Sequence, residues 1–441
     1  MQTVFERQAP PRAAVLASLQ ASVNRPFWLD DVGVRQRFVP LAGDATTDLA
    51  IVGGGFLGLW SAILAKERDP ERRVTLLEGD AIGWAASGRN GGFCEASLTH
   101  GEDNGERRWP EEFQQLEALG LRNLEEIAEA VQRYGIDCDS ERSGVMMVAV
   151  EPCQAATLHG EGCLDARQVR AEVDSPTFLA GQYDRQGTAM LHPGKLVTGL
   201  ARVALRTANG SLAATRVVLA TNAFPSLLRR YRSHTIPVYD YVLMTEPLSA
   251  SRLEAIGWKN RQGLADLGNQ FHYYRITRDN RILFGGYDAI YNFAGKVDDR
   301  HDDRPESFER LASHFFTTFP QLAGLRFTHR WGGAIDTCSR FCAFFADAHQ
   351  GRVVYAAGFT GLGVGATRFA ANVLLDKADG LDTERTRLRM VREKPMAFPP
   401  EPLTWATVQA TRWSLNRADH DHGKRNLFLR AMDAMGLGFD S

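Results

Sequence analysis

Residues 48–58 read DLAIVGGGFLG and are followed by LWSAILAKERDPERRVTLLEGD, which extends to residue 80. A short apolar run, a glycine turn, a helical pattern and a second apolar run follow one another, and the second run ends at Glu78. This order is typical of the strand–turn–helix–strand unit that begins many α/β folds.

The glycines of the turn, Gly53, Gly55 and Gly58, have the spacing Gly-x-Gly-x-x-Gly. The first allows a tight turn, the second lets the backbone approach a pyrophosphate, and the third lets the helix pack closely on the strand. The N-terminus of the helix offers unpaired N–H groups to phosphates. Glu78 stands at the distance along the chain where an acid accepts hydrogen bonds from ribose hydroxyls. The motif predicts an adenine dinucleotide and leaves FAD and NAD open.

The composition fits a globular protein of two or three domains, with 441 residues, 44% hydrophobic and 24% charged residues and a net charge of −2. This near-neutral balance argues against a nucleic-acid partner. No apolar stretch is long enough for a transmembrane helix. The apolar run AAVLASL near the N-terminus lacks the basic flank and cleavage site of a signal peptide. A homo-oligomer is left open.

The six cysteines, at positions 94, 138, 153, 163, 338 and 342, have no framework spacing. This usage predicts reduced thiols in a cytoplasmic protein. Cys338 and Cys342 match no zinc pattern, so we expect no metal site.

A segment dense in small residues, DAIGWAASGRNGGF, occupies residues 80–93. Small side chains let the backbone run close to a flat or phosphorylated ligand. An ordinary glycine-rich loop is the alternative. An NAD enzyme would normally continue here with another βα unit.

Three later stretches carry further signals. RVVLATNAF (216–224) predicts a parallel strand that ends in a small polar turn, and NQFHYYRITRDNRILFGG (269–286) predicts a hairpin that turns at Asp279 and Asn280. We expect one face of the hairpin to line a substrate pocket, the alternative being plain packing. VVYAAGFTGLGVG (353–365) predicts a strand, a glycine loop and a second helix N-terminus, which can stabilise negative charge on an electron-rich ring.

Together with WGG at 331–333, these motifs resemble, in order, those of the FAD-dependent D-amino-acid-oxidase-like superfamily, which includes glycine oxidase and sarcosine oxidase. The segment ASGRNGG (86–92) is most similar to the gamma-glutamylputrescine oxidoreductase branch. The resemblance spans about residues 48–380. It implies FAD and a mixed α/β and α+β architecture, in which a Rossmann-like FAD-binding domain is interleaved with a substrate domain built on an antiparallel or mixed sheet. Because the sequence shows no recognisable attachment motif, we expect the FAD to be bound non-covalently.

On this basis we expect four parts: an N-terminal arm (1–45), a discontinuous FAD-binding domain (46–135, 189–236 and 325–385), a substrate domain (136–188 and 237–324) and a C-terminal helical tail (386–441). We expect Trp405 and Trp413 to lie on a helix of this tail, which we interpret as a covering arm or a subunit contact.

The resemblance also implies which residues bind the cofactor. The ADP-ribose end is assigned Gly53, Gly55, Phe56, Leu57, Gly58, Glu78 and Gly79. The loop beside the pyrophosphate and the isoalloxazine is assigned Ala86, Ser87, Gly88, Arg89, Asn90, Gly91 and Gly92. The remaining assignments are Thr221 and Asn222 in one turn and Gly358, Thr360, Gly361, Leu362 and Gly363 in the C-terminal flavin loop.

The implied activity is oxidation of the C–N bond of a small-molecule amine or amino acid, with hydride transfer to flavin N5, formation of an imine and reoxidation by oxygen, giving H2O2, or by another acceptor. Sarcosine oxidase relatives carry a lysine over the flavin, where this sequence has Leu283 or Phe284, which leaves a dehydrogenase open. The stretch from Leu200 to Arg216 is shorter than the family's adenine-contacting region. The alternatives are a flavin-binding redox sensor or subunit without turnover, and an NAD-dependent dehydrogenase.

Six residues are candidates for the catalytic centre. Tyr241, Tyr274 and Trp331 are predicted to wall the amine. Arg275 could pair with a substrate carboxylate through its two-pronged guanidinium, a structural ion pair being the alternative. His272 and Asp336 are candidates for proton handling, for which packing is the alternative.

Overall fold

The first sheet carries the glycine-rich unit. The computed structural model describes residues 1–33, 38, 41, 43–204 and 212–437. Five strands lie in the order β15-β16-β9-β2-β3. Their bounds are β2 (Ala45–Val52), β3 (Val74–Leu77), β9 (Leu212–Leu219), β15 (Phe344–Ala348) and β16 (Val353–Ala357). Four strands are parallel and β15 is an antiparallel edge. The predicted Rossmann-like unit is confirmed.

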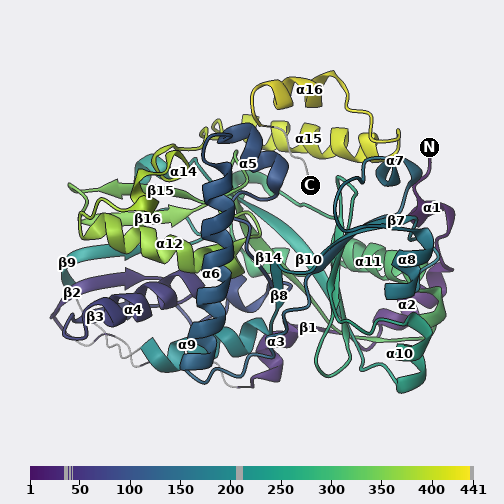
Figure 1. The fold of residues 1–441 in the computed structure, drawn as a ribbon, viewed down its shortest axis with the longest axis horizontal. Coiled ribbons are helices and arrows are strands. Elements are labelled where there is room, and N and C mark those ends of the chain that lie inside the picture. The colour runs from purple at the N-terminus through teal and green to yellow at the C-terminus, as the bar shows by residue number, and fades with distance from the viewer. Residues whose placement is uncertain (34–37, 39–40, 42, 205–211, 438–441) are drawn as a thin grey trace.

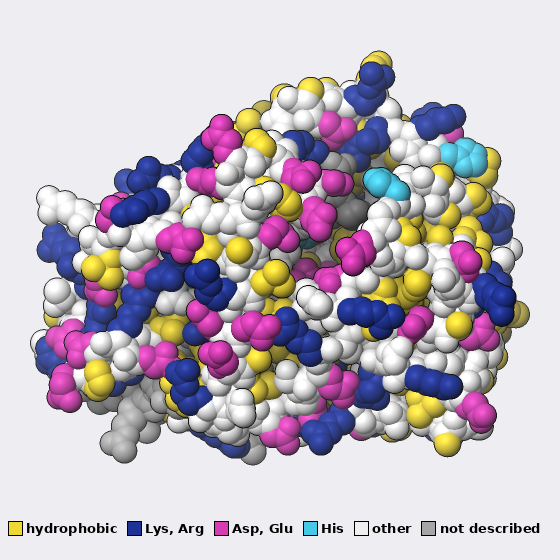
Figure 2. Space-filling model, viewed as in Figure 1, with side chains coloured by type: hydrophobic (Ala, Val, Ile, Leu, Met, Phe, Trp, Pro, Cys, Tyr) yellow, Lys and Arg dark blue, Asp and Glu magenta, His cyan; other side chains and the backbone are white. Residues whose placement is uncertain are grey.

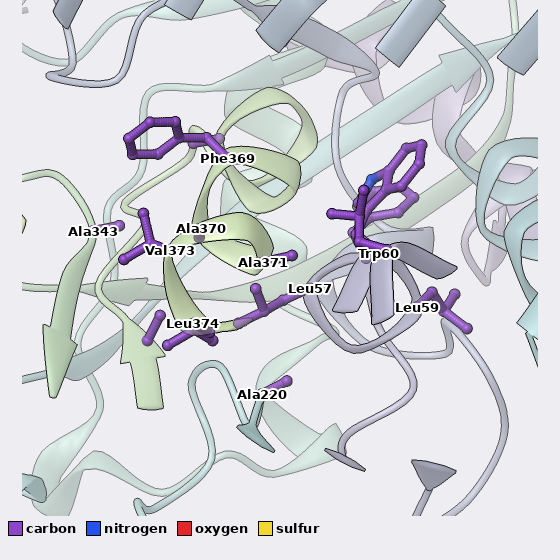
Figure 3. Close-up of a cluster of buried hydrophobic side chains, with 14 of the residues drawn as sticks. Leu57, Leu59, Trp60, Ala220, Ala343, Phe369, Ala370, Ala371, Val373 and Leu374 are labelled. Atoms are coloured by element: carbon purple, nitrogen blue, oxygen red, sulfur yellow. The ribbon is translucent and has the colours of Figure 1, made fainter. Parts of the chain in front are cut away.

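Two buried helices pack side by side on this sheet, α4 (Phe56–Arg68) and α12 (Gly363–Ala378). Figure 3 shows Leu57, Trp60, Phe369 and Leu374 in the apolar cluster that they share. The long amphipathic helix α6 (Phe113–Arg133) packs against α12, and α9 (Pro193–Ala204) packs against α4. Both glycine turns thus lead into helices held by one core.

The second sheet has nine strands in the order β1-β14-β10-β13-β12-β11-β5-β7-β6. Their bounds are β1 (Val23–Asn24), β5 (Val145–Ala149), β6 (Cys163–Asp165), β7 (Ala180–Asp184), β10 (Ile236–Thr245), β11 (Gly263–Asp266), β12 (His272–Ile276), β13 (Ile282–Gly286) and β14 (Phe327–Thr337). The sheet is mixed: β1–β14 and β11–β5 are parallel, and the other pairs are antiparallel. The predicted hairpin is β12–β13, with Asn280 at a φ of 64° in its turn.

The two faces of this sheet have different neighbours. One face, the packed face, carries Tyr241 and Tyr274 among other apolar side chains and is covered by α1 (Val4–Arg7), α2 (Arg12–Leu19) and α11 (Pro305–Thr318). The other face, the cavity face, carries Asp240, Val242 and Tyr273. Part of the cavity face is covered by α3 (Phe27–Asp31).

The remaining elements are a small sheet and several helices. A small sheet pairs β4 (Phe93–Glu95) with β8 (Thr188–Met190). Figure 1 shows α15 (Leu403–Asp419) and α16 (Leu427–Ala434) lying along one edge of the molecule, across the junction between the two large sheets. The short helices are α5 (Glu102–Arg108), α7 (Pro152–Ala155), α8 (Ala166–Glu172), α10 (Ala250–Ile256), α13 (Glu384–Arg387) and α14 (Arg389–Arg392).

Three sequence expectations bear on this arrangement. β14 belongs to the segment assigned to the FAD-binding domain but pairs with β10 in the nine-stranded sheet, so we propose a boundary after Thr337. The short stretch between Leu200 and Arg216 includes residues 205–211, which lie outside the described residues. Within the described ranges, no helix is both long and apolar enough to cross a membrane.

Candidate active site

A large cavity of about 1260 Å³ lies between the two sheets. Its lining runs from the first glycine turn, through residues 83–91, to the cavity face of the nine-stranded sheet and to α15. Figure 2 shows the surface hollowed at this junction, with acidic side chains around the hollow. The predicted nucleotide end and the predicted substrate face therefore open into one space.

The first glycine turn is tightly packed. Gly53 has a φ of +115°, and a Cβ there would lie 2.3 Å from the Ala220 carbonyl oxygen. A Cβ on Gly58 would lie 1.9 Å from the oxygen of Gly53, so the helix can approach the turn only without a side chain. Phe56 N–H donates to the Ser87 Oγ at 2.9 Å. Gly55, Phe56 and Leu57 line the cavity, which places the N-terminus of α4 at its edge.

Glu78 lies at the end of β3 and organises the backbone around it. Its Oε2 accepts from Gly54 N–H at 2.6 Å, and its Oε1 accepts from Gly79 N–H at 2.8 Å. The indole N–H of Trp84 also donates to Oε1, at 3.2 Å. Glu78 and Gly79 both line the cavity.

The loop formed by residues 86–92 is held from both sides. The Asn90 side chain donates to the Ala86 carbonyl at 3.0 Å and accepts from Gly92 N–H at 2.9 Å. Arg89 pairs with Asp302 and donates to the Gly332 carbonyl at 2.9 Å. Ala86, Ser87, Arg89, Asn90 and Gly91 line the cavity, whereas Gly88 and Gly92 pack behind it.

The second glycine turn, residues 358–363, lines the same cavity. Thr360, Gly361, Leu362 and Gly363 line it, and Gly358 lies behind them against Cys338. Helix α12 begins at Gly363 with no side chain capping its N–H groups. Thr221 and Asn222 also line the cavity, and Asn222 has a φ of 48°.

Asp336 anchors this second turn. Its Oδ2 accepts from the N–H groups of Gly358 at 2.7 Å and Phe359 at 3.2 Å. Burial raises the pKa of Asp336 to about 6, against the effect of these donors. The sequence predicted proton handling for Asp336. In the structure Asp336 lines the cavity, and its carboxylate positions the loop that begins at Gly358.

Tyr273 and Asp240 form the central polar pair of the cavity face. The Tyr273 hydroxyl donates to Asp240 Oδ2 at 2.6 Å, and Tyr241 N–H donates to Oδ1 at 2.7 Å. Burial raises the pKa of Asp240 to about 6. Cβ atoms on Gly91 and Gly285 would each lie 2.8 Å from the Tyr273 ring, so these glycines leave room for it.

Three candidate catalytic residues lie on the packed face, away from the cavity. The Tyr241 hydroxyl donates to the His301 carbonyl at 2.9 Å, and Tyr274 is 1% exposed. His272 lies between Asp266, at 2.6 Å, and His314, at 2.9 Å. We therefore no longer propose Tyr241 and Tyr274 as walls around the amine, and for His272 we keep packing, the alternative to proton handling. The physical reason is strand alternation, which sends adjacent residues to opposite faces.

The other two candidates are on the cavity side but support the 86–92 loop. Arg275 Nη1 donates to the carbonyls of Leu191 at 2.6 Å and Gly92 at 3.2 Å. The Trp331 indole donates to the Arg89 carbonyl at 2.8 Å. Neither side chain lines the large cavity. For Arg275 we therefore prefer a structural role to the pairing with a substrate carboxylate. Its partners are backbone carbonyl groups and not the acidic side chain of an ion pair.

Several lining residues carried no sequence signal of their own. Glu95, Glu117 and Asp184 bring carboxyl groups into one part of the lining, and Arg412 of α15 brings a guanidinium. Burial and then Asp184 raise the pKa of Glu95 to about 7. Burial, followed by Glu102 and Asp184, raises the pKa of Glu117. Tyr273 could have been identified from the hairpin alternation once the inner face was known.

Comparisons with known proteins agree with this geometry. The DAO family, described as FAD dependent oxidoreductase, matches residues 48–210 and 202–376. Gamma-glutamylputrescine oxidoreductase from Escherichia coli is 32% identical over 392 residues, which cover 79% of this chain and 87% of that protein. A probable oxidoreductase OrdL from Haemophilus influenzae is 25% identical over 403 residues, covering 82% of this chain and 89% of that protein.

Solved structures show the same fold. Glycine oxidase from Geobacillus kaustophilus superposes with a TM-score of 0.61 at 18% identity, covering 77% of this chain and 96% of that chain. The family match decides between the two dinucleotides that the first motif left open. The chain belongs to the DAO family of FAD-dependent oxidoreductases, and its cofactor is FAD.

Proposed function

We propose that this enzyme oxidises the C–N bond of an amine or amino acid to an imine, with hydride transfer to N5 of a non-covalently bound FAD. The observation that carries the proposal is the continuity of the cavity, which joins the dinucleotide turns to the Tyr273 face of the nine-stranded sheet. By their names, the Escherichia coli relative acts on an amine and the Geobacillus structure is an oxidase of an amino acid.

The residues present fit FAD. Helix α4 begins at a cavity edge made of Gly53, Gly54 and Gly55, and a helix N-terminus at such an edge suits a pyrophosphate. At the opposite turn, the uncapped N-terminus of α12 has open space beside Gly361, where a Cβ would meet no atom within 4 Å. A helix N-terminus there favours negative charge on a ring. The 86–92 loop and Thr221 and Asn222 would complete the site.

When bound, FAD supplies the hydride acceptor. The residues of the chain must then orient the substrate, exclude water and select an amine as the substrate. The Asp240 carboxylate fixes the Tyr273 ring by a 2.6 Å hydrogen bond, so this wall is rigid. Glu95, Glu117 and Asp184 give one part of the lining a negative potential that attracts a protonated amine. These groups bind and position; none needs to act as a nucleophile.

The proposal is tested with purified holoprotein. The protein should be yellow, and one member of a panel of amines and amino acids should bleach the flavin bands under anaerobic conditions. Uptake of oxygen with release of H2O2 on readmission of air would identify an oxidase, and slow uptake with fast turnover on an artificial acceptor would identify a dehydrogenase. Bound flavin that no panel member reduces would favour the redox sensor or subunit instead.

A further inference from the structure

The C-terminal segment builds a wall of the substrate side of the cavity. One face of α15 lines it with Thr404, Thr407, Val408, Thr411, Arg412 and Leu415, which recur at helical spacing. The family match ends at residue 376, so this wall lies outside the matched region. Figure 1 shows α15 lying over the junction of the sheets.

Several hydrogen bonds fix α15 to the nine-stranded sheet. Asp419 accepts from Asn269 N–H at 2.9 Å and from Gln270 N–H at 3.1 Å, in the connection between β11 and β12. At the other end, the Tyr291 hydroxyl donates to Glu401 at 2.6 Å. Side chains on this helix are therefore held in place relative to the cavity.

Arg412 stands in this wall without an acidic partner. Its Nη1 donates to Gln409 Oε1 at 2.9 Å, and its Nε is buried with no hydrogen-bond partner. Among the described residues, no carboxylate forms an ion pair with it. The side chain is half-buried, and leaving its buried Nε without a hydrogen-bond partner carries a cost in free energy. The side chain therefore has binding capacity that the protein itself does not use.

The surroundings of Arg412 reinforce this excess of positive charge. Asp288, which also lines the cavity, is already engaged at both oxygens, by Arg310 at 2.6 Å and by Ser307 and Arg304 at 2.6 and 3.1 Å. Two guanidiniums thus occupy this carboxylate, and the guanidinium of Arg412 is a third positive charge near it without a direct bond to it. Burial lowers the pKa of Arg412, and Arg304 and Arg310 lower it further against the effect of Asp288. An anion would relieve both the burial and the repulsion.

We propose that Arg412 binds a carboxylate of the substrate, so that the preferred substrates are amines that carry a carboxylate remote from the oxidised C–N bond. This inference rests on the proposed function. The lining supplies opposite charges on different elements, carboxyl groups on β4, α6 and β7 and the guanidinium on α15, which complements a substrate with a cationic and an anionic end. The FAD phosphates are assigned to the glycine turns, whereas Arg412 is grouped with Asp288, which follows β13.

The test compares substrates that differ only in this charge. The holoenzyme is assayed with 4-aminobutanoate and 5-aminopentanoate and with their methyl esters. Wild type should prefer the acids. Arg412→Gln should lower kcat/KM for an acid by about 10- to 100-fold, mainly through KM, because a charge-assisted hydrogen bond is lost, and should leave the esters unchanged. Arg412→Lys should fall between the two, because it keeps the charge without the two-pronged geometry.

Arg417→Gln is the matched control, because Arg417 lies on the same helix but is exposed and stacks on Trp413. It should match wild type with every substrate. Flavin content and melting temperature of each variant show that it is folded. Equal losses for acid and ester in Arg412→Gln, or no loss for the acid, would overturn the inference.

A binding experiment separates this inference from the proposed function. Pentanoate is titrated into the holoproteins of wild type, Arg412→Gln and Arg417→Gln by calorimetry, which needs no turnover. Weaker binding to Arg412→Gln by about tenfold or more, with unchanged binding to Arg417→Gln, supports the carboxylate site even when no amine reduces the flavin. Equal binding to all three, or no binding to wild type, contradicts it.

Discussion

Adjacent residues on β10 and β12 experience opposite surroundings on the two faces of the nine-stranded sheet. Tyr274 packs among Phe284, Trp258 and Phe319, with ring centroids 5.0–6.2 Å away. Tyr273, the preceding residue, reaches the cavity and donates to a carboxylate. The same residue type thus contributes core stability on one face and a polar wall on the other. A one-residue shift of register would exchange the two roles.

The strongest test of this contrast removes the packed tyrosine. Tyr274→Ala should lower the free energy of unfolding by about 3–5 kcal/mol, the usual cost of deleting a buried aromatic side chain. Chemical denaturation followed by circular dichroism measures this. The folded fraction should keep the wild-type rate of flavin reduction, and a selective loss of rate would place Tyr274 at the reaction after all.

Tyr273→Phe probes the cavity face. The change removes one hydrogen bond to a carboxylate, which contributes about 1.5–3 kcal/mol. Because the hydroxyl lowers the pKa of Asp240, that pKa should rise from about 6 in the variant. The pH profile of anaerobic flavin reduction, followed by stopped flow, should shift its acid limb upward. An unchanged profile would mean that Asp240 does not influence the reaction.

A histidine gives the packed face its own pH dependence. Burial, then His272 and Arg310, lower the pKa of His314 well below its usual value. A depressed pKa in the folded state means that the stabilising contribution is present above about pH 6.5, the unfolded value, and is lost as the pH falls. The free energy of unfolding should decline by up to about 1.4 kcal/mol per pH unit between pH 6.5 and 5. His314→Gln should flatten that decline, and an equally steep decline would assign it to other groups.

Glu95 lines the cavity, and Glu95→Gln should have the smallest effect of these substitutions. With its pKa raised to about 7, Glu95 is mostly charged at pH 8 and mostly neutral at pH 6. For a cationic amine, kcat/KM should therefore fall by up to about tenfold at pH 8 and hardly at pH 6. The exposed Asp103 of α5 supplies the control, because Asp103→Asn removes a charge outside the cavity lining. Equal losses at both pH values would contradict this role.

Local patterns in the sequence were sufficient to predict the structural units whose elements are consecutive in the chain. The β2–α4–β3 unit, the β12–β13 hairpin and the turn into α12 each depend on glycine spacing or strand alternation within a short stretch. Alternation also separated Tyr273 from Tyr274, but it could not tell which face would be covered. That outcome depends on α11 and the N-terminal helices, which are distant in sequence.

The charged lining was beyond sequence reasoning for a related reason. Glu95 and Glu117 occupy a strand and an amphipathic helix where an acid normally meets solvent, and only the arrangement of β4, α6 and β7 brings carboxyl groups together. Arg412 belongs to a tail without a motif. Arg275, by contrast, is a residue type that binds carboxylates and lies on the predicted hairpin. In the folded chain, however, its guanidinium donates to backbone carbonyl groups.

The loop formed by residues 86–92 also has a thermodynamic consequence. It receives the Trp331 indole and holds Asp302 and the Gly332 carbonyl on the side of the nine-stranded sheet, while Ser87 receives the first N–H of α4 beside the other sheet. Neither half can unfold without exposing contacts of the other. Heating should therefore melt both sheets in one cooperative transition. FAD at 100 times its Kd should add about 2.7 kcal/mol to the stability of the whole body, rather than to one half.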